Sequence, residues 1–316
     1  MKKSARTGTG KYERLLATCR KLSPVDAAVV YPCEETALRA AIEAAQARLI
    51  RPILVGPAKQ LVQLARRLKL DLDPYQVVDV PDSQAAAAKA VELVREGAAE
   101  ILMKGSLHTD EFLAAIVARD TGLRTARRLS HVFVMDVPDY HKVFMITDAA
   151  INIAPGLEDK ADILRNAIDL AIALGVKQPK VAILSAVETV TTKIPSTIDA
   201  AAPCKMAERG QIRGALLDGP LAFDNAISKA AARTKGIHSR VAGDVDILLA
   251  PDLEAGNMLA KQLSFLARAD SAGLVLGARV PVVLTSRADS VRARLASVAV
   301  AVRLAHRRRT GTAGDY

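Results

Sequence analysis

The sequence is poor in aromatic residues and in cysteine. It contains no tryptophan, and aromatic side chains make up 3 % of its 316 residues. Proteins that stack nucleic-acid bases on aromatic rings need more rings than this, so a nucleic-acid partner is not expected. The cysteines, Cys19, Cys33 and Cys204, are too few and too widely spaced for a disulfide framework or a structural zinc site. This cysteine usage predicts a cytoplasmic protein.

Long apolar runs are also absent from the sequence. No stretch of about 18 consecutive apolar residues occurs, and the charged amino-terminal segment is not followed by an apolar run of signal-peptide length. We therefore expect neither a membrane span nor secretion. Apolar residues nevertheless make up 50 % of the chain, enough for a large buried core at this length.

The net charge of +10 is concentrated at the two ends of the chain. Residues 1–14 hold five basic residues and one acidic residue, and residues 303–316 hold four and one, which leaves +3 for the body. Basic termini are common and mobile, so we interpret both ends as solvated tails rather than nucleic-acid arms. The mildly positive body favours small anionic substrates.

Short runs rich in β-branched residues alternate with Ala-rich segments of helical period, which predicts an α/β fold with repeated βαβ units and mainly parallel strands. The predicted strands are 27–30, 52–55, 77–80, 101–103, 132–136, 143–147, 181–184, 214–217, 245–249, 273–276 and 282–284. The predicted helices are 34–48, 57–68, 83–95, 110–119, 157–174, 224–232, 254–267 and 289–304. Eleven strands exceed a usual sheet, so we expect two sheets and two domains. A Pro-Gly step within 148–156 is the hinge candidate.

In open α/β sheets, ligands bind beyond the carboxyl ends of the strands, so polar residues that follow strands are candidate site residues. The segment MKGSLHT places Lys104 and Gly105 on a strand-to-helix turn, where a phosphate would meet a cation and backbone amides. Thr109 is a candidate helix cap in the same segment. An ordinary capped turn with an exposed lysine explains the segment equally well.

Two further segments collect polar side chains near strand ends. In DGPLAFDNAIS, Asp218 has no local helix to cap, whereas Asp224 and Asn225 are either ligand contacts or part of a helix start. In EAGNMLAKQ, Asn257 and Lys261 are four residues apart and share one helix face, which is also typical of a solvated polar stripe.

The segment PVVLTSRADS joins a buried strand to the last long helix. Ser286 and Asp289 are both candidate N-caps. Arg287 beside a helix N-terminus is electrostatically unfavourable, which suggests that an anion lies between them. No HExxH spacing and no Walker loop occur, so the sequence predicts no metal site and no nucleotide loop of that type.

In their order along the chain, the motifs MKGSLHT, LSHVFVMDVPDYHKVFMITDAAINIAPGLEDK, DGPLAFDNAIS, VDILLAPDLEAGNMLAKQL and PVVLTSRADS resemble the phosphate acetyltransferase and phosphate butyryltransferase family over roughly residues 20–305. TSRADS and MKG resemble the butyryltransferase branch more closely. The resemblance implies two three-layer α/β domains with mainly parallel sheets and a cleft between them, in an architecture related to isocitrate and isopropylmalate dehydrogenases. Residues 1–148 plus 290–316 would form the first domain and 149–289 the second. The resemblance also implies a homodimer, no bound cofactor, and coenzyme A as a substrate.

The family reaction is acyl-CoA plus phosphate giving acyl phosphate plus CoA, through a ternary complex in which the CoA thiolate attacks acyl phosphate directly. A thiol with a pKa of about 8.5 is mostly protonated at neutral pH, so a base is needed, and we expect Asp289 or else Asp218. The resemblance assigns Ser286 to the thiol or the developing oxyanion and Arg287 to phosphate. The acetyltransferase branch carries an arginine shortly after its HT step that residues 108–114 lack, so phosphate binding would depend on Lys104 or another residue.

Three other functions compete with this one. The first is a related acyltransferase that makes long-chain acyl phosphate for lipid synthesis. The second is a metal-dependent decarboxylating dehydrogenase of the same fold, with Asp218 and Asp224 as ligands of a divalent cation. The third is a binding module for CoA or nucleic acid that has lost its chemistry, a reading supported only by the basic ends.

Overall fold

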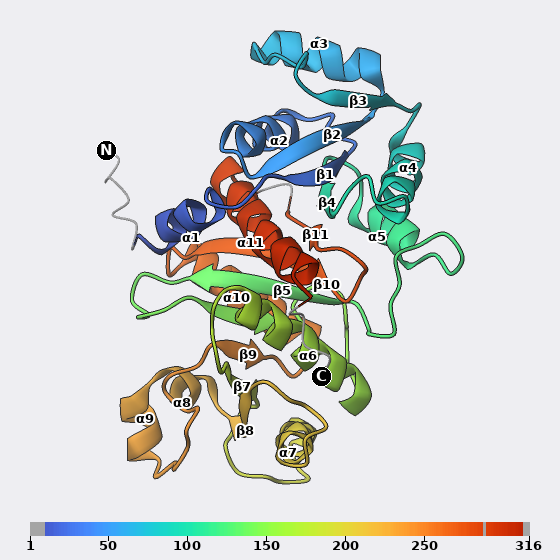
Figure 1. Cartoon of the computed structure of the whole chain (residues 1–316). Coiled ribbons are helices and arrows are strands. Elements are labelled where there is room, and N and C mark those ends of the chain that lie inside the picture. Colours follow the sequence, from blue (N-terminus) through green and yellow to red (C-terminus); the bar gives the residue numbers. More distant parts are fainter. Residues whose placement is uncertain (1–9, 287–288, 312–316) are drawn as a thin grey trace.

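The computed structural model describes residues 10–286 and 289–311, and the strands of this part form one continuous sheet that runs the length of the molecule (Figure 1). Along the sheet the order is β3-β2-β1-β4-β11-β10-β5-β6-β9-β7-β8. The strands are β1 (Val25–Val30), β2 (Ile50–Gly56), β3 (Gln76–Asp79), β4 (Ile101–Lys104), β5 (Ser130–Asp136), β6 (Phe144–Thr147), β7 (Lys180–Leu184), β8 (Leu216–Leu221), β9 (Ile247–Leu249), β10 (Asp270–Leu276) and β11 (Val282–Val283). All eleven predicted strands are therefore found, but the prediction of two separate sheets is wrong.

The sheet is parallel within each half and reverses direction in the middle. Strands β3, β2, β1, β4 and β11 are mutually parallel, and so are β6, β9, β7 and β8. Between the halves, β11–β10, β10–β5 and β5–β6 pair antiparallel, and this is how the eleven strands join into one sheet. The carboxyl ends of the strands in one half consequently lie at the opposite edge of the sheet from those in the other half.

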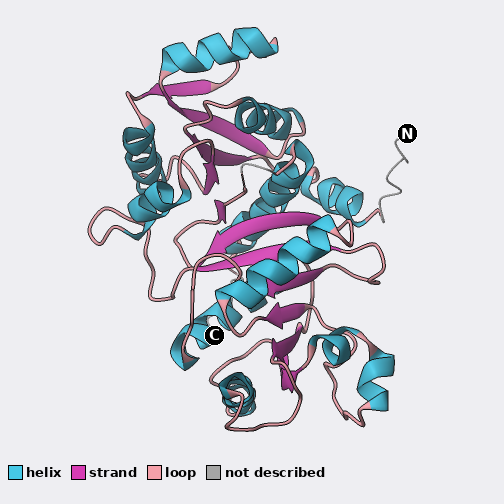
Figure 2. Ribbon diagram, turned by 180° about the vertical axis from the view of Figure 1, so that it is seen from behind, coloured by secondary structure: helices cyan, strands magenta, loops and turns pink. Residues whose placement is uncertain are grey.

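Helices cover both faces of the sheet and give three layers (Figure 2). They are α1 (Lys11–Cys19), α2 (Glu35–Gln46), α3 (Ala58–Leu68), α4 (Ser83–Arg95), α5 (Thr109–Val117), α6 (Leu157–Ala173), α7 (Pro195–Glu208), α8 (Phe223–Ile227), α9 (Lys229–Thr234), α10 (Leu253–Phe265) and α11 (Val291–Arg309). One face has a single apolar core, to which α1, α2, α3, α6, α7 and α11 contribute. The opposite face has two separate cores, one under α4 and α5 and one under α8, α9 and α10. Burial is thus continuous on one side and divided on the other.

Parts of both basic ends belong to the folded body, which corrects the prediction of solvated tails for these residues. Lys11 forms an ion pair with Asp136 (Nζ to Oδ1, 2.9 Å), and its Nζ also donates to the carbonyls of Val137 and Tyr140. At the other end, Arg303 and Arg307–Arg309 lie within α11. Arg309 Nε donates to Glu100 Oε2 at 2.6 Å. The charges of Lys11 and Arg309 therefore fix α1 and α11 to the folded body and are not available to bind a polyanion.

Candidate functional site

Strands β4 and β11 are adjacent and parallel, so the segments that follow them leave the sheet side by side. The register pairs Met103 with Val283, which places Lys104 next to Leu284 and one step from the 285–290 loop. Neighbouring strands lie about 4.8 Å apart. The structure thus brings together two of the predicted segments, MKGSLHT and PVVLTSRADS. Lys104 is buried, with 3 % of its surface exposed.

Ser286 and Asp289 form a reciprocal turn at the end of this loop. The backbone N–H of Ser286 donates to Asp289 Oδ2 at 2.7 Å, and the N–H of Asp289 donates to the Ser286 carbonyl at 3.1 Å. Neither residue is the N-cap of α11; Ser290 is, and its Oγ accepts from the Ala293 N–H at 3.2 Å. Asp289 is free for a role other than capping, and the Ser286 side chain is exposed. Arg287 lies outside the described residues.

Arg294 lies beneath the loop and is almost completely buried, with 2 % of its surface exposed. Its Nη2 donates to the Ser286 carbonyl at 3.0 Å, whereas its Nε and Nη1 have no hydrogen-bond partner in the described part of the chain. A buried cation with unpartnered donors destabilises the fold, because hydrogen bonds do not offset the free energy of removing the charge from water. Sequence reasoning missed this residue; its only signal was a second arginine, two residues after Arg292, at the start of α11.

Burial shifts the pKa values of Asp289 and Arg294 in the directions that favour the neutral form of each group. The pKa of Asp289 is raised by burial, against the opposing effects of the Ser286 N–H and of Arg294. The pKa of Arg294 is lowered by burial, and the nearby Asp289 opposes that shift. A carboxyl group with a raised pKa is a stronger base than an exposed aspartate. The site therefore holds the Asp289 carboxylate, whose pKa is raised, beside the exposed Ser286 hydroxyl group and above the buried Arg294 cation.

Gly105 brings the β4 loop into contact with the end of β1. Its N–H donates to the Val30 carbonyl at 2.9 Å, and Ser106 Oγ donates to the Tyr31 carbonyl at 2.7 Å. A Cβ at position 105 would lie 2.3 Å from the Val30 oxygen and 2.5 Å from the Tyr31 oxygen. Only glycine fits this approach of two backbones.

Replacing Gly105 with alanine is expected to lower the free energy of unfolding by about 3 kcal/mol, because the clash is with backbone atoms that cannot move away. Urea unfolding followed by circular dichroism measures the change. Gly156→Ala is the matched control, since Gly156 has a φ of −76° and a Cβ there would meet only Asp159 Oδ2, at 4.0 Å. Equal stabilities of the two variants would contradict the argument.

A second polar cluster lies where the sheet changes direction. Asp148 follows β6, is 2 % exposed, and accepts hydrogen bonds from the N–H groups of His131, Ala150 and Ile151 at 2.9–3.0 Å and from Asn152 Nδ2 at 2.6 Å. The Asn257 side chain donates to the Ala149 carbonyl at 2.9 Å and so fixes this loop to α10. The Asp148 carboxylate is thus occupied by backbone N–H groups and the Asn152 side chain. We interpret this cluster as a structural brace that fixes the loop after β6.

His131 is buried within this brace, near the carbonyl of Leu284 and so next to the Ser286 loop, and its Nδ1 has no hydrogen-bond partner in the described part of the chain. Burial lowers the pKa of His131 to about 4, against the opposing effects of Asp148 and of the Leu284 carbonyl. The imidazole is therefore neutral at pH 7. It acts as a packing group, with its ring 4.4 Å from that of Phe133, rather than as a cation.

We expect the free energy of unfolding to fall as the pH is lowered from about 6.5 to about 4, because between these values the unfolded chain binds a proton that folded His131 excludes. The loss should reach about 2 kcal/mol by pH 5. Urea unfolding at pH 7 and pH 5 measures it, and His131→Asn should reduce the difference. His238→Asn, at an exposed position, is the control. A variant with an unchanged pH difference would contradict the prediction.

The DGPLAFDNAIS segment lies far from Ser286 within one chain. Strand β8 is six positions from β11 in the sheet, which corresponds to about 29 Å at ordinary strand spacing. Asp218 lies inside β8 rather than after it, and its Oδ1 accepts from the Gly219 N–H at 2.9 Å. Asp224 forms an ion pair with Lys235 at 3.1 Å, and buried Asn225 donates to Glu188 at 3.2 Å. The Asn225 Oδ1 is buried and has no hydrogen-bond partner in the described part of the chain.

Two other predicted residues lie on helix surfaces. Thr109 is exposed in the first turn of α5, whose N-cap is His108, so the prediction of a Thr109 cap is wrong. Lys261 is exposed on α10, one turn beyond Asn257. Within residues 10–286 and 289–311, no group of three His, Cys, Asp or Glu side chains is placed to hold a metal ion. No helix of this part is long and apolar enough to cross a membrane.

Residues 83–302 match the model of the phosphate acetyl/butaryl transferase family. The chain is 65 % identical over 299 residues to a phosphate acetyltransferase of Rhizobium meliloti, with 95 % of each protein covered. The chain belongs to the phosphate acetyl/butyryltransferase family. It is an acyltransferase enzyme, and the resemblance inferred from the motifs is confirmed.

Members of both branches of this family are similar to the chain. A phosphate butyryltransferase of Clostridium beijerinckii is 40 % identical over 296 residues, with 94 % of this chain and 98 % of the relative covered. The identity is thus higher to the Rhizobium acetyltransferase, the reverse of what TSRADS and MKG suggested. A branched-chain phosphotransacylase from Enterococcus faecalis V583 has the same fold, with a TM-score of 0.77, 30 % identity, and coverage of 89 % of this chain and 99 % of that one.

Proposed function

We propose that this phosphate acyltransferase transfers an acetyl group between CoA and phosphate, and that the reaction takes place at the 104–109 and 285–290 segments. The observation that carries the proposal is the junction of β4 and β11, which places a buried lysine, a glycine turn, an exposed serine and a tuned carboxylate at neighbouring strand ends. The 65 % identity to the Rhizobium acetyltransferase supports acetyl as the acyl group.

In the proposed mechanism the CoA thiol loses its proton to Asp289 and the sulfur attacks the carbonyl carbon of acetyl phosphate. The new C–S bond forms as the C–O bond to phosphate breaks, and phosphate leaves with the electron pair. Asp289 is preferred to Asp218 as the base because it adjoins Ser286, whereas Asp218 lies six strands away in the sheet. Ser286 donates to the thiol or to the developing oxyanion, and Lys104, with Arg287, attracts phosphate.

Rates of thioester formation from acetyl, propionyl, butyryl and branched acyl phosphates with CoA test the proposal. We expect acetyl phosphate to react fastest, because the chain is more similar to the acetyltransferase than to the butyryltransferase. A faster reaction with butyryl phosphate would overturn the assignment of acetyl. Initial rates at varied concentrations of both substrates should give intersecting double-reciprocal lines, as direct attack in a ternary complex requires, and parallel lines would refute it. No NAD reduction is expected with added Mg²⁺.

We also propose that the enzyme is a homodimer and that α10 lies in the contact. Large apolar side chains are exposed on and beside this helix: Met258 (58 %), Phe265 (78 %), Leu266 (81 %) and Ile153 (75 %). The Leu253 N–H donates to the Ile153 carbonyl at 3.0 Å, so Ile153 adjoins the start of α10. Exposed apolar side chains gathered on one face are typical of protein interfaces. Light scattering after gel filtration should show a dimer, and Phe265→Asp should shift it toward the monomer.

A further inference from the structure

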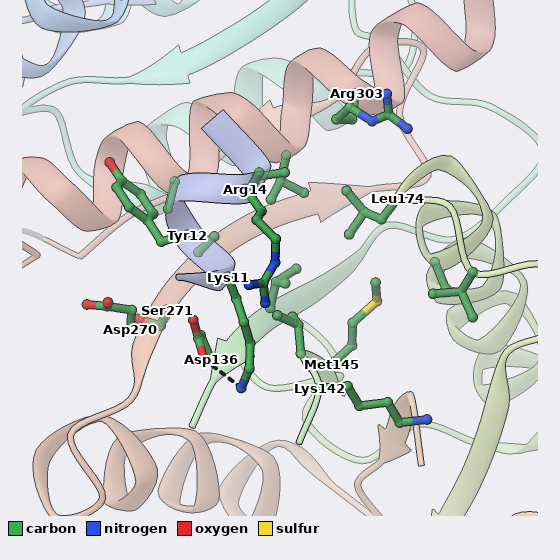
Figure 3. A pocket seen from close by; sticks show the side chains of 18 of the residues that line it. Lys11, Tyr12, Arg14, Asp136, Lys142, Met145, Leu174, Asp270, Ser271 and Arg303 are labelled. Carbon is green, nitrogen blue, oxygen red and sulfur yellow. Dashed lines mark ion pairs between the residues drawn. The ribbon is translucent and has the colours of Figure 1, made fainter. Parts of the chain in front are cut away.

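A cavity of about 440 Å³ lies beneath α1, on the face of the sheet that carries α6 and α11 (Figure 3). We call it the α1 cavity. Its sheet wall comes from β5, β6 and β10, through Val134, Met145 and Ala272. Its helix walls come from α1, α6 and α11. The volume is in the range of sites that hold small organic ligands, about 300–1,000 Å³.

The α1 cavity is separate from the Ser286 loop, although both adjoin α11. Ala296 and Val300 of α11 line the cavity, whereas Arg294 contacts the Ser286 carbonyl. Successive residues are about 100° apart around a helix, so Ala296 lies about 200° from Arg294. The helix therefore stands between the two sites. The function proposed for the loop makes no use of the cavity.

The interior of the cavity is largely apolar. Leu15, Val143, Leu174 and Val176 line it together with the sheet residues Val134 and Met145. Figure 3 shows Met145 and Leu174 on the side away from Lys11 and Asp136. An apolar wall of this kind favours a hydrocarbon portion of a ligand over a sugar or a nucleotide.

The acidic residues of the cavity wall are already neutralised by basic partners. Asp136 pairs with Lys11 at 2.9 Å, and Asp246 pairs with Lys142 at 2.7 Å. Asp270 pairs with Arg292 at 3.2 Å. A cationic ligand would have to displace one of these partners, so the wall does not favour a positive charge.

Two arginines at the cavity have no carboxylate partner in the described ranges. In Figure 3 the Arg14 side chain extends from α1 into the cavity beside Lys11, whereas Arg303 lies on α11 beyond Leu174 and its guanidinium group points away from Arg14. Arg303 Nη2 donates to the Ala173 carbonyl at 3.2 Å, and no ion pair joins either arginine to an acidic group among residues 10–286 and 289–311. An arginine fork suits a carboxylate well.

We propose that the α1 cavity binds a small amphipathic monocarboxylate, with its hydrocarbon chain against the apolar wall and its carboxylate at Arg14, in the positive field to which Arg303 adds. Helix α1 holds such a ligand in place, because Lys11 fixes the helix to the β5–β6 connection through the carbonyls of Val137 and Tyr140. The site is independent of the acyl-transfer site.

Isothermal titration of the full chain with sodium octanoate tests the proposal, and 1-octanol is the neutral probe of the same chain length. We expect octanoate to bind at one site with a Kd on the order of 1 mM or below, and octanol at least roughly tenfold more weakly. The double variant Arg14→Gln/Arg303→Gln should lose octanoate affinity by roughly tenfold or more. The control is Arg20→Gln, at an exposed arginine of the α1 C-cap that does not line the cavity.

Further measurements assign the binding to this cavity. Ala296→Leu narrows the cavity without changing its charge and should also weaken octanoate, while Arg14→Gln alone should do so without changing any packed residue. Saturating CoA and phosphate should leave octanoate binding unchanged. Displacement by CoA, equal affinity of Arg14→Gln/Arg303→Gln and the unmodified protein, or no binding by the unmodified protein would each overturn the proposal. None of these outcomes depends on whether the acyl-transfer proposal is correct.

Discussion

Replacing Asp289 by asparagine is expected to lower kcat for thioester formation from acetyl phosphate and CoA by roughly 10²–10⁴-fold, the usual contribution of a general base. Asparagine keeps an oxygen that can accept the Ser286 N–H, now bound at 2.7 Å, so the loop geometry should persist. Because burial raises the pKa of Asp289, the unmodified enzyme should lose activity as the pH falls and this carboxylate is protonated. That acid limb should be absent from the pH profile of the variant.

Two measurements keep this prediction specific. The KM for CoA should change little, since the side chain acts on the proton rather than on binding. Asp120→Asn, at an exposed carboxylate in the turn after α5, should leave kcat unchanged. A variant Asp289→Asn with normal kcat would exclude this residue as the base and would return attention to Asp218, which would then have to come from another subunit.

Replacing Arg294 by methionine is expected to lower kcat/KM for acetyl phosphate by roughly 10- to 100-fold. The change removes the hydrogen bond from Nη2 to the Ser286 carbonyl and the cation that faces Asp289. Without that cation, the pKa of Asp289 should rise further, so the acid limb of the pH profile should move to higher pH.

Stability separates a positioning role from a purely structural one at this residue. Arg294 is buried with its Nε and Nη1 unpartnered in the described part of the structure, so an apolar side chain of similar length should be neutral or stabilising for the fold. Lower activity with unchanged or higher stability would support positioning. Arg294→Lys keeps the charge and should return the acid limb toward its original position. A shift that persists in the lysine variant would contradict the electrostatic argument.

The sequence predicted each strand of the sheet but not how the strands assemble. Apolar β-branched runs such as 181–184 and 101–103 are local signals, and the structure has β7 and β4 there. The order of the strands depends on contacts between distant residues, as where β11 enters between β4 and β10. Periodicity holds no information about such pairing. An expectation of two sheets therefore followed from strand number alone.

Helix predictions failed where a local rule was overridden. Helix α7 was missed because Pro203 lies inside it, and proline usually ends a helix. Helix α1 was missed because its charges resemble a solvated tail. The single helix predicted over 224–232 is divided at Ser228, which caps α9 by accepting from the Ala231 N–H at 3.2 Å.

At the site, sequence reasoning identified the residues that follow strands and missed the residues beneath them. Lys104, the last residue of β4, and Ser286 and Asp289, which follow β11, were found because the end of a strand is visible in the sequence. Arg294 and His131 act through burial, which depends on how distant segments pack. The proximity of Ser286 to Lys104, and the remoteness of Asp218, follow from the strand order and were likewise not predictable.

The position of β11 between β4 and β10 also has a consequence for synthesis of the chain on the ribosome. Until residues 282–283 emerge, β4 presents an open edge, and an unpaired edge is a template for association with other chains. Helix α11 packs on α2, α1 and β10, so the amino-terminal half also waits for the end of the chain to cover its core. Nascent chains that stall before β11 should be the species most prone to aggregate.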